Sequence, residues 1–431
     1  MGARRVLPAL DGLRAVAAGA VLLTHVAFRT GQTQAGAGGA VLGRLDVGVA
    51  VFFVLSGFLL YPRTRPVGRY ALRRAARILP AYWVLLAAVA VGGSVPAAYW
   101  WLGQGYGTVP LAGALTQTWT LVPEVAFYAV LPGLVWLARR WEWPVLAGCL
   151  LVAYGWIAAV HLLDLPDRML LWLPGHLDWF AVGMAVAALA RRGVPGWLTQ
   201  LAAASGTCWA AAGALLFLLA TPVAGPLTLA PVPGGAAVLK EAGYALVAAL
   251  LLVPAALGPR APVLGSPPLR LLGRWSYGIF LWHLVVLDAV YRITGWPDFS
   301  GRTIAVAVLT VLGAVALGGL SWLLVERPAL RLADRVAAGP ASRIGGGVGG
   351  GVAGGVAGRV AGRVAGRVAG RGGGRGAQRG PVHQRRGDHA ERDGGERLVG
   401  PLDPAGARLD GEQHAGDRER AARAGGPPPP G

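Results

Sequence analysis

Hydrophobic residues along the chain gather into ten runs of about the length that crosses a bilayer as a helix. Most arginines stand between these runs, where loops are expected. The pattern predicts an all-α polytopic membrane protein with about ten transmembrane helices. The runs cover residues 7–28, 46–62, 78–93, 122–138, 144–163, 169–190, 197–220, 238–257, 275–292 and 303–325.

The region between the third and fourth runs, residues 94–120, is uncharged and aromatic. It contains Tyr99, Trp100, Trp101 and Tyr106. Its pattern is compatible with a loop and also with an interfacial or re-entrant helix, so the sequence alone leaves its structure open.

Composition supports the membrane class. Hydrophobic residues make up 54% of the chain and charged residues only 14%, and the mean hydropathy is +0.51. A net charge of +19 is compatible with nucleic-acid binding, but the basic residues show no face interleaved with aromatic residues. We therefore expect no nucleic-acid partner, and membrane lipid as the surroundings.

Arginine and lysine are distributed unequally between the two ends of the predicted helices. With the N-terminus inside, one side receives about three times as many as the other, which predicts a multi-pass protein of the cell membrane with both termini cytoplasmic. The poorer side holds only Arg29, Arg44, Arg168, Lys240, Arg292 and Arg302.

The composition changes near residue 336 to glycine, arginine and alanine. We therefore divide the chain into a membrane domain, residues 1–335, and a low-complexity tail, residues 336–431, that is predicted to be disordered. The tail is either dispensable or an electrostatic attachment to anionic lipid.

The first run contains two ionisable side chains, Arg14 and His25. Eleven residues of helix return to within about 20° of the same direction and rise about 16 Å, so both side chains lie on one face. Ionisable groups are costly at membrane depth, and a pair on one face is expected to line a protein interior or a polar cavity. This pair is the leading site candidate.

Other polar residues have competing interpretations. Arg74 and Arg77 are one helical turn apart and suit a phosphate, although arginines beside a membrane helix also serve as topology signals. Glu124, in the first turn of the fourth predicted helix, suits a role at a helix N-terminus as well as catalysis. Ser56 precedes Gly57 in a pair of small residues that favours helix packing. His283 is either a structural hydrogen-bonding group or a catalyst.

Taken together and in order, these motifs resemble the membrane acyltransferase-3 family, polytopic enzymes that O-acylate sugars and other acceptors. The resemblance covers about residues 7–330. It implies ten helices, an acyl-CoA donor, and essential roles for Arg14, His25, Arg74 and Arg77. The matching elements are Leu10 to Ala15 leading to His25, Phe52 to Phe58, the Arg74/Arg77 pair, Trp119 to Tyr128, Ser276 to His283, and Glu326-Arg327-Pro328.

We therefore expect an O-acyltransferase, most simply an O-acetyltransferase, that moves an acyl group from acetyl-CoA to a hydroxyl of a cell-surface glycan or glycosylated small molecule. The arginines would hold the phosphates of the donor. His25 would be the general base, and a transient acyl-histidine is the competing mechanism. The aromatic region 94–120 would contact the acceptor.

Four residues are expected to support substrate binding or structure. Asp11 is predicted to pair with Arg14, and Glu124 to orient the imidazole or bind the acceptor. No metal and no permanently bound cofactor are expected. The main alternative class is a secondary transporter or flippase for a sugar or a lipid-linked sugar. The four supporting residues are Asp11, Ser56, Tyr277 and His283.

Overall fold

The structure is a computed structural model that describes residues 7–61, 63–107, 113–227, 232–259 and 261–338. Nearly all of the tail predicted from residue 336 lies outside these residues. All regular elements of the described ranges are helical. The α-helices are α1 (Pro8–Arg29), α2 (Gly36–Gly43), α3 (Gly48–Leu60), α4 (Val67–Gly92), α5 (Leu121–Leu162), α6 (Leu177–Arg192), α7 (Gly196–Ala203), α8 (Ser205–Leu219), α9 (Gly234–Leu257), α10 (Pro267–Thr294), α11 (Thr303–Ser321) and α12 (Arg327–Ala338).

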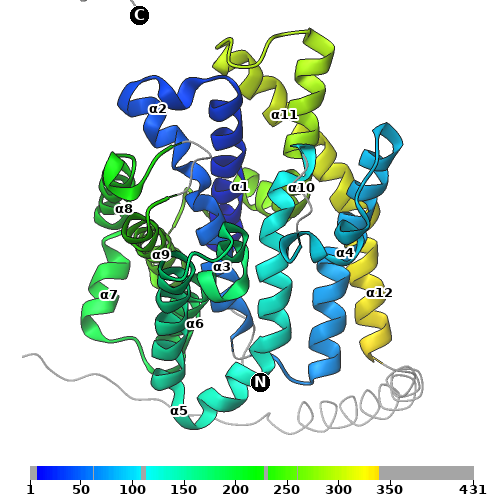
Figure 1. The fold of residues 1–431 in the computed structure, drawn as a ribbon. Helices are drawn as coiled ribbons and strands as arrows, with labels where there is room; N and C mark the ends of the chain where they lie inside the picture. The colour runs from blue at the N-terminus through cyan, green and yellow to red at the C-terminus, as the bar shows by residue number, and fades with distance from the viewer. Residues whose placement is uncertain (1–6, 62, 108–112, 228–231, 260, 339–431) are drawn as a thin grey trace, which may run out of the picture. The chain divides into compact units, whose positions relative to one another are not determined.

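The predicted all-α membrane class is confirmed. Eight helices in the described ranges are long and apolar enough to span a membrane, and nine if α7 and α8, bent by 81°, form one broken span. The tenth comes from α5, because its 42 residues would be about 63 Å long, twice the hydrocarbon thickness. Its backbone leaves the helical region at Trp141 (φ −136°, ψ 56°), and Figure 1 shows α5 turning there from cyan to green.

The turn of α5 is held by a buried carboxylate, that of Glu142. It accepts hydrogen bonds from the Tyr61 hydroxyl (2.5 Å) and from Arg192 Nε (2.5 Å), and it also pairs with Arg191. Burial, followed by the hydrogen bond to Glu142, raises the pKa of Tyr61 above its ordinary value. The cluster joins the ends of α3 and α6 to the middle of α5.

Helix α1 contacts several helices that are distant in sequence. It packs against α10, α3, α11 and α9 (Figure 1). Small residues permit the close contacts: a Cβ on Gly48 of α3 would lie 2.4 Å from the Ala17 carbonyl oxygen, and one on Gly273 of α10 would lie 1.9 Å from that of Asp11. The polar face of α1 is thereby placed against α3 and α10.

Helices α3 and α6 meet at two glycines. A Cβ on Gly183 would lie 2.0 Å from the Val54 carbonyl oxygen, and one on Gly57 would lie 2.2 Å from the Phe180 carbonyl oxygen. Two backbones can approach this closely only where side chains are absent. Gly57 therefore serves helix packing, whereas the neighbouring Ser56 has a polar contact described below.

The aromatic region contains only short 3₁₀ helices in its described part: η3 (Ala97–Trp101), η4 (Gly103–Gly105) and η5 (Gly113–Thr120). Tyr99 is fully buried, and its carbonyl accepts a hydrogen bond from the Tyr82 hydroxyl (2.7 Å). Element η5 leads directly into α5. The region therefore docks against α4, and its last residues begin the next membrane segment.

The α3–α6 contact gives a first testable prediction. Replacing Gly183 by alanine should destabilise the protein by about 1–3 kcal/mol, because the new methyl group collides with the α3 backbone. Thermal unfolding of the detergent-solubilised protein measures the loss. Gly133→Ala is the matched control, because nothing lies within 4 Å of a Cβ built at Gly133. Equal midpoints for the two variants would contradict the packing argument.

Candidate active site

An inner cavity, which we call the arginine chamber, lies between α1, α3, α4, α5 and α10. Its volume is about 90 Å³, and three of its four charged side chains are arginines. It brings together six of the residues singled out in the sequence. Those six residues are Arg14, Ser56, Arg74, Arg77, Glu124 and Tyr277.

The three arginines differ in how they are compensated. Arg77 Nη1 forms an ion pair with Glu326 Oε2 at 2.7 Å, and the Glu326 side chain is fully buried. Within the described ranges, Arg14 and Arg74 form no ion pair, and the buried Nε of Arg74 has no hydrogen-bond partner. Their charges are therefore available to an anionic ligand.

Arg77 is also held by aromatic rings. Its guanidinium lies 5.4 Å from the centre of the Tyr277 ring and 5.6 Å from that of Trp322. Trp322 and Glu326 bound a single π-helical turn, Trp322–Glu326, which joins α11 to α12. The sequence motif at Glu326 therefore positions Arg77, a role that sequence reasoning did not assign.

Glu124 lines the arginine chamber from the first turn of α5, and no side-chain hydrogen bond from the described residues caps that end of the helix. Its Oε1 accepts hydrogen bonds from the Tyr128 hydroxyl at 2.5 Å and the Ser56 hydroxyl at 3.3 Å. The Arg74 guanidinium lies 5.8 Å from the centre of the Tyr128 ring. Tyr128, one turn after Glu124 on α5, is thus a site residue that the sequence analysis did not single out.

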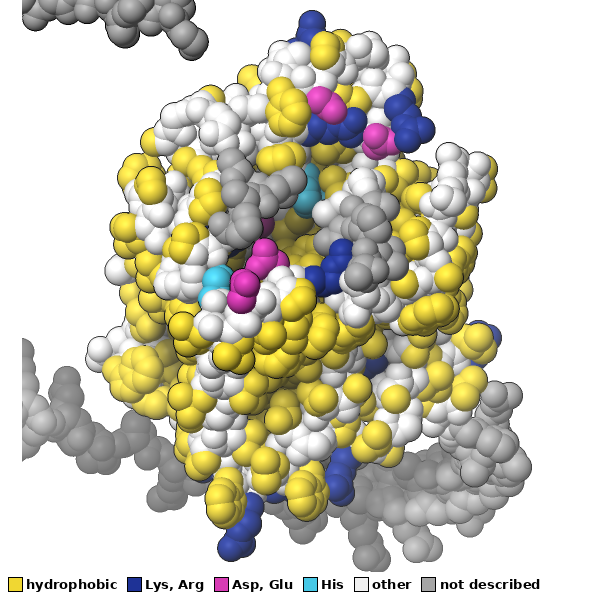
Figure 2. All heavy atoms as spheres, viewed as in Figure 1, with side chains coloured by type: hydrophobic (Ala, Val, Ile, Leu, Met, Phe, Trp, Pro, Cys, Tyr) yellow, Lys and Arg dark blue, Asp and Glu magenta, His cyan; other side chains and the backbone are white. Residues whose placement is uncertain are grey.

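A second and larger cavity, the outer cavity, has a volume of about 860 Å³. Figure 2 shows a hollow in this face in which carboxylate and histidine side chains are visible. His25 lines the outer cavity, whereas Arg14 lines the chamber. Helix α1 therefore contributes ionisable side chains to both cavities: Arg14 to the chamber, and His25 and Arg29 to the outer cavity.

The two cavities meet at three side chains. Val49 of α3, Thr120 at the start of α5 and Phe280 of α10 line both of them. Phe280 packs edge-on against Phe52 (ring centres 5.8 Å apart). We call Val49, Thr120 and Phe280 the constriction, because they lie where the arginine chamber and the outer cavity adjoin.

His25 packs against the second membrane histidine, with ring centres 5.2 Å apart. His283 is buried, and its Nδ1 donates to the Phe280 carbonyl oxygen at 2.6 Å. In a neutral ring with its proton on Nδ1, Nε2 is a hydrogen-bond acceptor. The Nε2 of His283 has no hydrogen-bond partner in the described structure. His283 thus joins His25 to the constriction and itself lines neither cavity.

Two expectations about placement are corrected, and a third is narrowed to part of its region. Asp11 and Arg14 form no ion pair in the described ranges, and the Asp11 backbone instead packs against Gly273. Glu124 and His25 line different cavities, so the carboxylate is not placed to orient the imidazole. Within region 94–120, Tyr99 packs beside α4 and Tyr106 packs against Trp172, and neither lines a cavity. Trp119 and other residues of η5, at the end of the same region, line the outer cavity.

The outer cavity contains polar residues that the sequence did not reveal. His176 Nδ1 lies 2.8 Å from Glu241 Oε1. Lys240 Nζ lies 3.2 Å from Asp46 Oδ2, and the Tyr244 hydroxyl donates to the same carboxylate. These pairs join residues 65 and about 200 positions apart, so spacing along the chain carries no signal for them.

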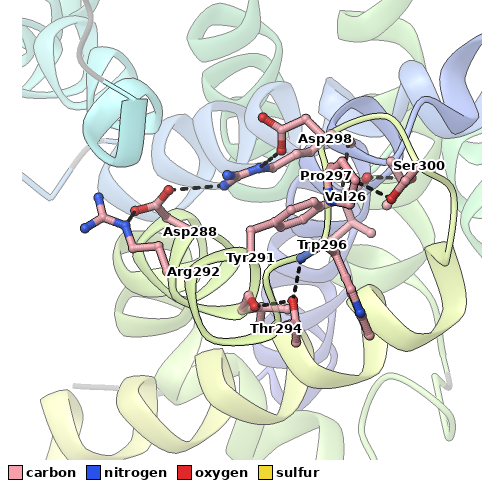
Figure 3. Close-up of polar contacts among 12 residues, drawn as sticks. Val26, Asp288, Tyr291, Arg292, Thr294, Trp296, Pro297, Asp298 and Ser300 are labelled. Atoms are coloured by element: carbon pink, nitrogen blue, oxygen red, sulfur yellow. Dashed lines mark hydrogen bonds and ion pairs between the residues drawn. The ribbon is translucent and has the colours of Figure 1, made fainter.

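The rim of the outer cavity carries a separate charge network. Arg29 contacts the carboxylates of Asp298 (2.8 Å) and Asp288 (3.4 Å), and Arg292 contacts Asp288 at 2.7 Å. Figure 3 shows Asp288 and Asp298 directed at a shared guanidinium. Both carboxylates at this rim are therefore paired.

These features define a multi-pass membrane protein whose helices enclose two adjoining polar cavities of opposite charge. A family model described as an acyltransferase domain matches residues 7–320. The chain thus belongs to the acyltransferase-3 family, as its motifs predicted.

Curated relatives agree with this assignment. The chain is 31% identical to the exopolysaccharide production protein ExoZ of Rhizobium meliloti, over 69% of this chain and 93% of ExoZ. It is 30% identical to acyltransferase MdmB of Streptomyces mycarofaciens, over 76% of this chain and 93% of MdmB. It is 23% identical to peptidoglycan O-acetyltransferase OatA of Listeria monocytogenes, over 75% of this chain and 56% of OatA. No solved structure matches the chain at a significant level.

The Arg77–Glu326 pair gives a second prediction. Glu326→Gln should lower the free energy of unfolding by about 3 kcal/mol, because it leaves a largely buried guanidinium without its counter-ion. Asp334→Asn is the control. It breaks the exposed Arg73–Asp334 pair, which joins α4 to α12, and should cost at most about 1 kcal/mol. Chemical denaturation of both variants measures the difference, and an equal loss would refute a special role for Glu326.

Proposed function

We propose that this protein is a membrane O-acyltransferase, in the simplest case an O-acetyltransferase, that transfers an acyl group from acyl-CoA to a carbohydrate hydroxyl. The observation that carries the proposal is the meeting of the two cavities at the constriction, beside the His25–His283 pair. Two substrates can thus approach one point from separate cavities. The relatives ExoZ, an exopolysaccharide production protein, and OatA, a peptidoglycan O-acetyltransferase, support a glycan as the acceptor class.

The donor is assigned to the arginine chamber. Its arginines suit the phosphates of coenzyme A, and the arginine-rich loops beside it suit the cytoplasm, where both termini would lie. A chamber of about 90 Å³ is far below the several hundred Å³ of a site for a whole nucleotide. The nucleotide would therefore remain at the mouth, and the thin pantetheine arm would carry the thioester inward.

His25 is assigned as the general base. An alcohol is a weak nucleophile at neutral pH, and an imidazole at hydrogen-bonding distance can accept its proton as the oxygen attacks the thioester carbon. The sulfur leaves as the CoA thiolate and the acyl group passes to the acceptor oxygen. In the competing mechanism, a His25 nitrogen attacks the thioester first and an acyl-histidine forms.

His25→Ala gives the direct test of this function. Release of CoA thiol from acetyl-CoA, measured with the purified protein in lipid nanodiscs and a panel of glycan acceptors, should fall by about 10²- to 10⁴-fold. His161→Gln is the control, because both ring nitrogens of His161 contact backbone carbonyls and the residue lines neither cavity. Unchanged release in His25→Ala would exclude His25 as the base.

The same preparation separates the alternatives. Acid quenching after a single turnover without acceptor, followed by mass spectrometry, detects an acyl group on His25 only in the covalent mechanism. If the protein never consumes acetyl-CoA and yet moves a sugar or a lipid-linked sugar across the membrane, the transporter or flippase class replaces the enzyme.

Donor binding gives a further prediction. Arg74→Ala should raise the KM for acetyl-CoA by about tenfold or more, because it removes a charge-assisted contact to a phosphate. Arg73→Ala is the matched control: the adjacent arginine pairs with Asp334 and does not line the chamber. Steady-state kinetics with varied acetyl-CoA measures both. Equal KM values for the two variants would place the donor elsewhere.

A further inference from the structure

The outer cavity carries the opposite charge to the arginine chamber. Within the described residues, its lining includes five carboxylates and two basic side chains. The chamber lining includes three arginines and one carboxylate. The charged residues of the outer cavity are Asp46, Asp167, Glu241, Asp288, Asp298, Arg29 and Lys240.

The carboxylates are not equally available to a ligand. Asp288 and Asp298 at the rim are paired with Arg29, and Asp46 is paired with Lys240. Glu241 instead contacts a histidine, His176, which brings no fixed positive charge. In the described structure, the carboxylates of the outer cavity that lack a basic partner are therefore the largely buried Glu241 and the exposed Asp167.

His176 is positioned as a hydrogen-bond acceptor for a ligand. Its ring stacks on Trp179 (ring centres 4.7 Å apart) and also packs against Trp119 at 5.4 Å. A neutral ring whose Nδ1 donates to Glu241 carries its lone pair on Nε2. His176 is 6% exposed, and its Nε2 has no partner in the described structure. A buried acceptor without a partner is costly unless a ligand donates to it.

We propose that the outer cavity binds a carbohydrate acceptor that carries no anionic group. One sugar hydroxyl donates to His176 Nε2, and the ring of the sugar packs against Trp119, which lines the cavity and is only partly buried. The carboxylate excess admits a neutral or amino-bearing sugar and repels a uronate or a phosphorylated sugar. This inference rests on the proposed function and adds the chemical class of the acceptor.

The separation of charge also assigns each substrate to its own cavity. A polyanionic donor is attracted to the arginine chamber and repelled by the outer cavity. An acceptor without negative charge gains nothing from the arginines. The two substrates are thereby kept from exchanging places, although the cavities adjoin at Val49, Thr120 and Phe280.

The test uses three methyl glycosides that differ chiefly in charge: a glucoside, a glucosaminide and a glucuronide. Binding to the full-length protein in nanodiscs of neutral lipid is followed without donor, by quenching of tryptophan fluorescence. The wild type should bind the glucuronide about tenfold or more weaker than the other two. Glu241→Gln should reduce this discrimination, and His176→Phe, which retains the stacking ring, should weaken binding of all three about tenfold.

Asp164→Asn is the matched control. Like Glu241→Gln, it removes one negative charge. Asp164 is exposed, lies three residues before Asp167 and lines neither cavity, and its positive φ of 49° tolerates asparagine. Binding in this variant should equal that in the wild type. Equal binding of the three glycosides to the wild type would overturn the proposal. So would unchanged binding in both Glu241→Gln and His176→Phe.

Acetyl transfer to the same three glycosides separates this inference from the proposed function. If the charge preference in binding holds while acetyl-CoA is never consumed, the acceptor site stands and the enzyme assignment fails. If transfer occurs equally well to all three sugars, the enzyme assignment stands and the charge selection fails. The thermal unfolding midpoint is measured for Glu241→Gln and for His176→Phe. If one of the two variants does not fold, binding in the other variant decides whether the proposal holds.

Discussion

The cost of placing charge at membrane depth constrains the whole structure. An ionisable side chain inside the helical body is stabilised by a partner or by a polar cavity that it faces. Arg44 shows the first solution. This buried residue donates to the carbonyls of Leu219 (2.9 Å) and Ala224 (3.0 Å), and so ties the end of α2 to the end of α8. Arg14 and His25 show the second, because they line cavities. The positions of charge therefore identify both the joints of the fold and its site.

Sequence alone predicts the features that depend on local periodicity. Hydrophobic runs predict the membrane segments. The division of α5 into two runs is also predicted correctly, because Arg139 and Arg140 interrupt the apolar pattern next to the break at Trp141. The eleven-residue spacing of Arg14 and His25 predicted a shared helix face, and α1 is one continuous helix of 22 residues. The helical rise and turn are fixed by the backbone, so such predictions need no tertiary information.

Features that depend on contacts between distant segments could not be predicted in this way. Glu326 meets Arg77 across 249 positions, and His176 meets Glu241 across 65. Each of these residues by itself resembles a topology signal or an ordinary polar residue at a helix end. The aromatic region 94–120 was predicted only in part for the same reason: Trp119 lines the outer cavity, but Tyr99 is used in packing against Tyr82.

The constriction has a consequence for the membrane itself. Two polar cavities that approach each other within a bilayer protein form a possible leak for water and protons. Val49 and Phe280, with Thr120 as the only polar member, place a mainly apolar barrier at their junction. Narrow apolar segments of this kind resist wetting, as they do in the gates of channels. The protein can thus hold charged groups on both sides of one point while the membrane potential is maintained across it.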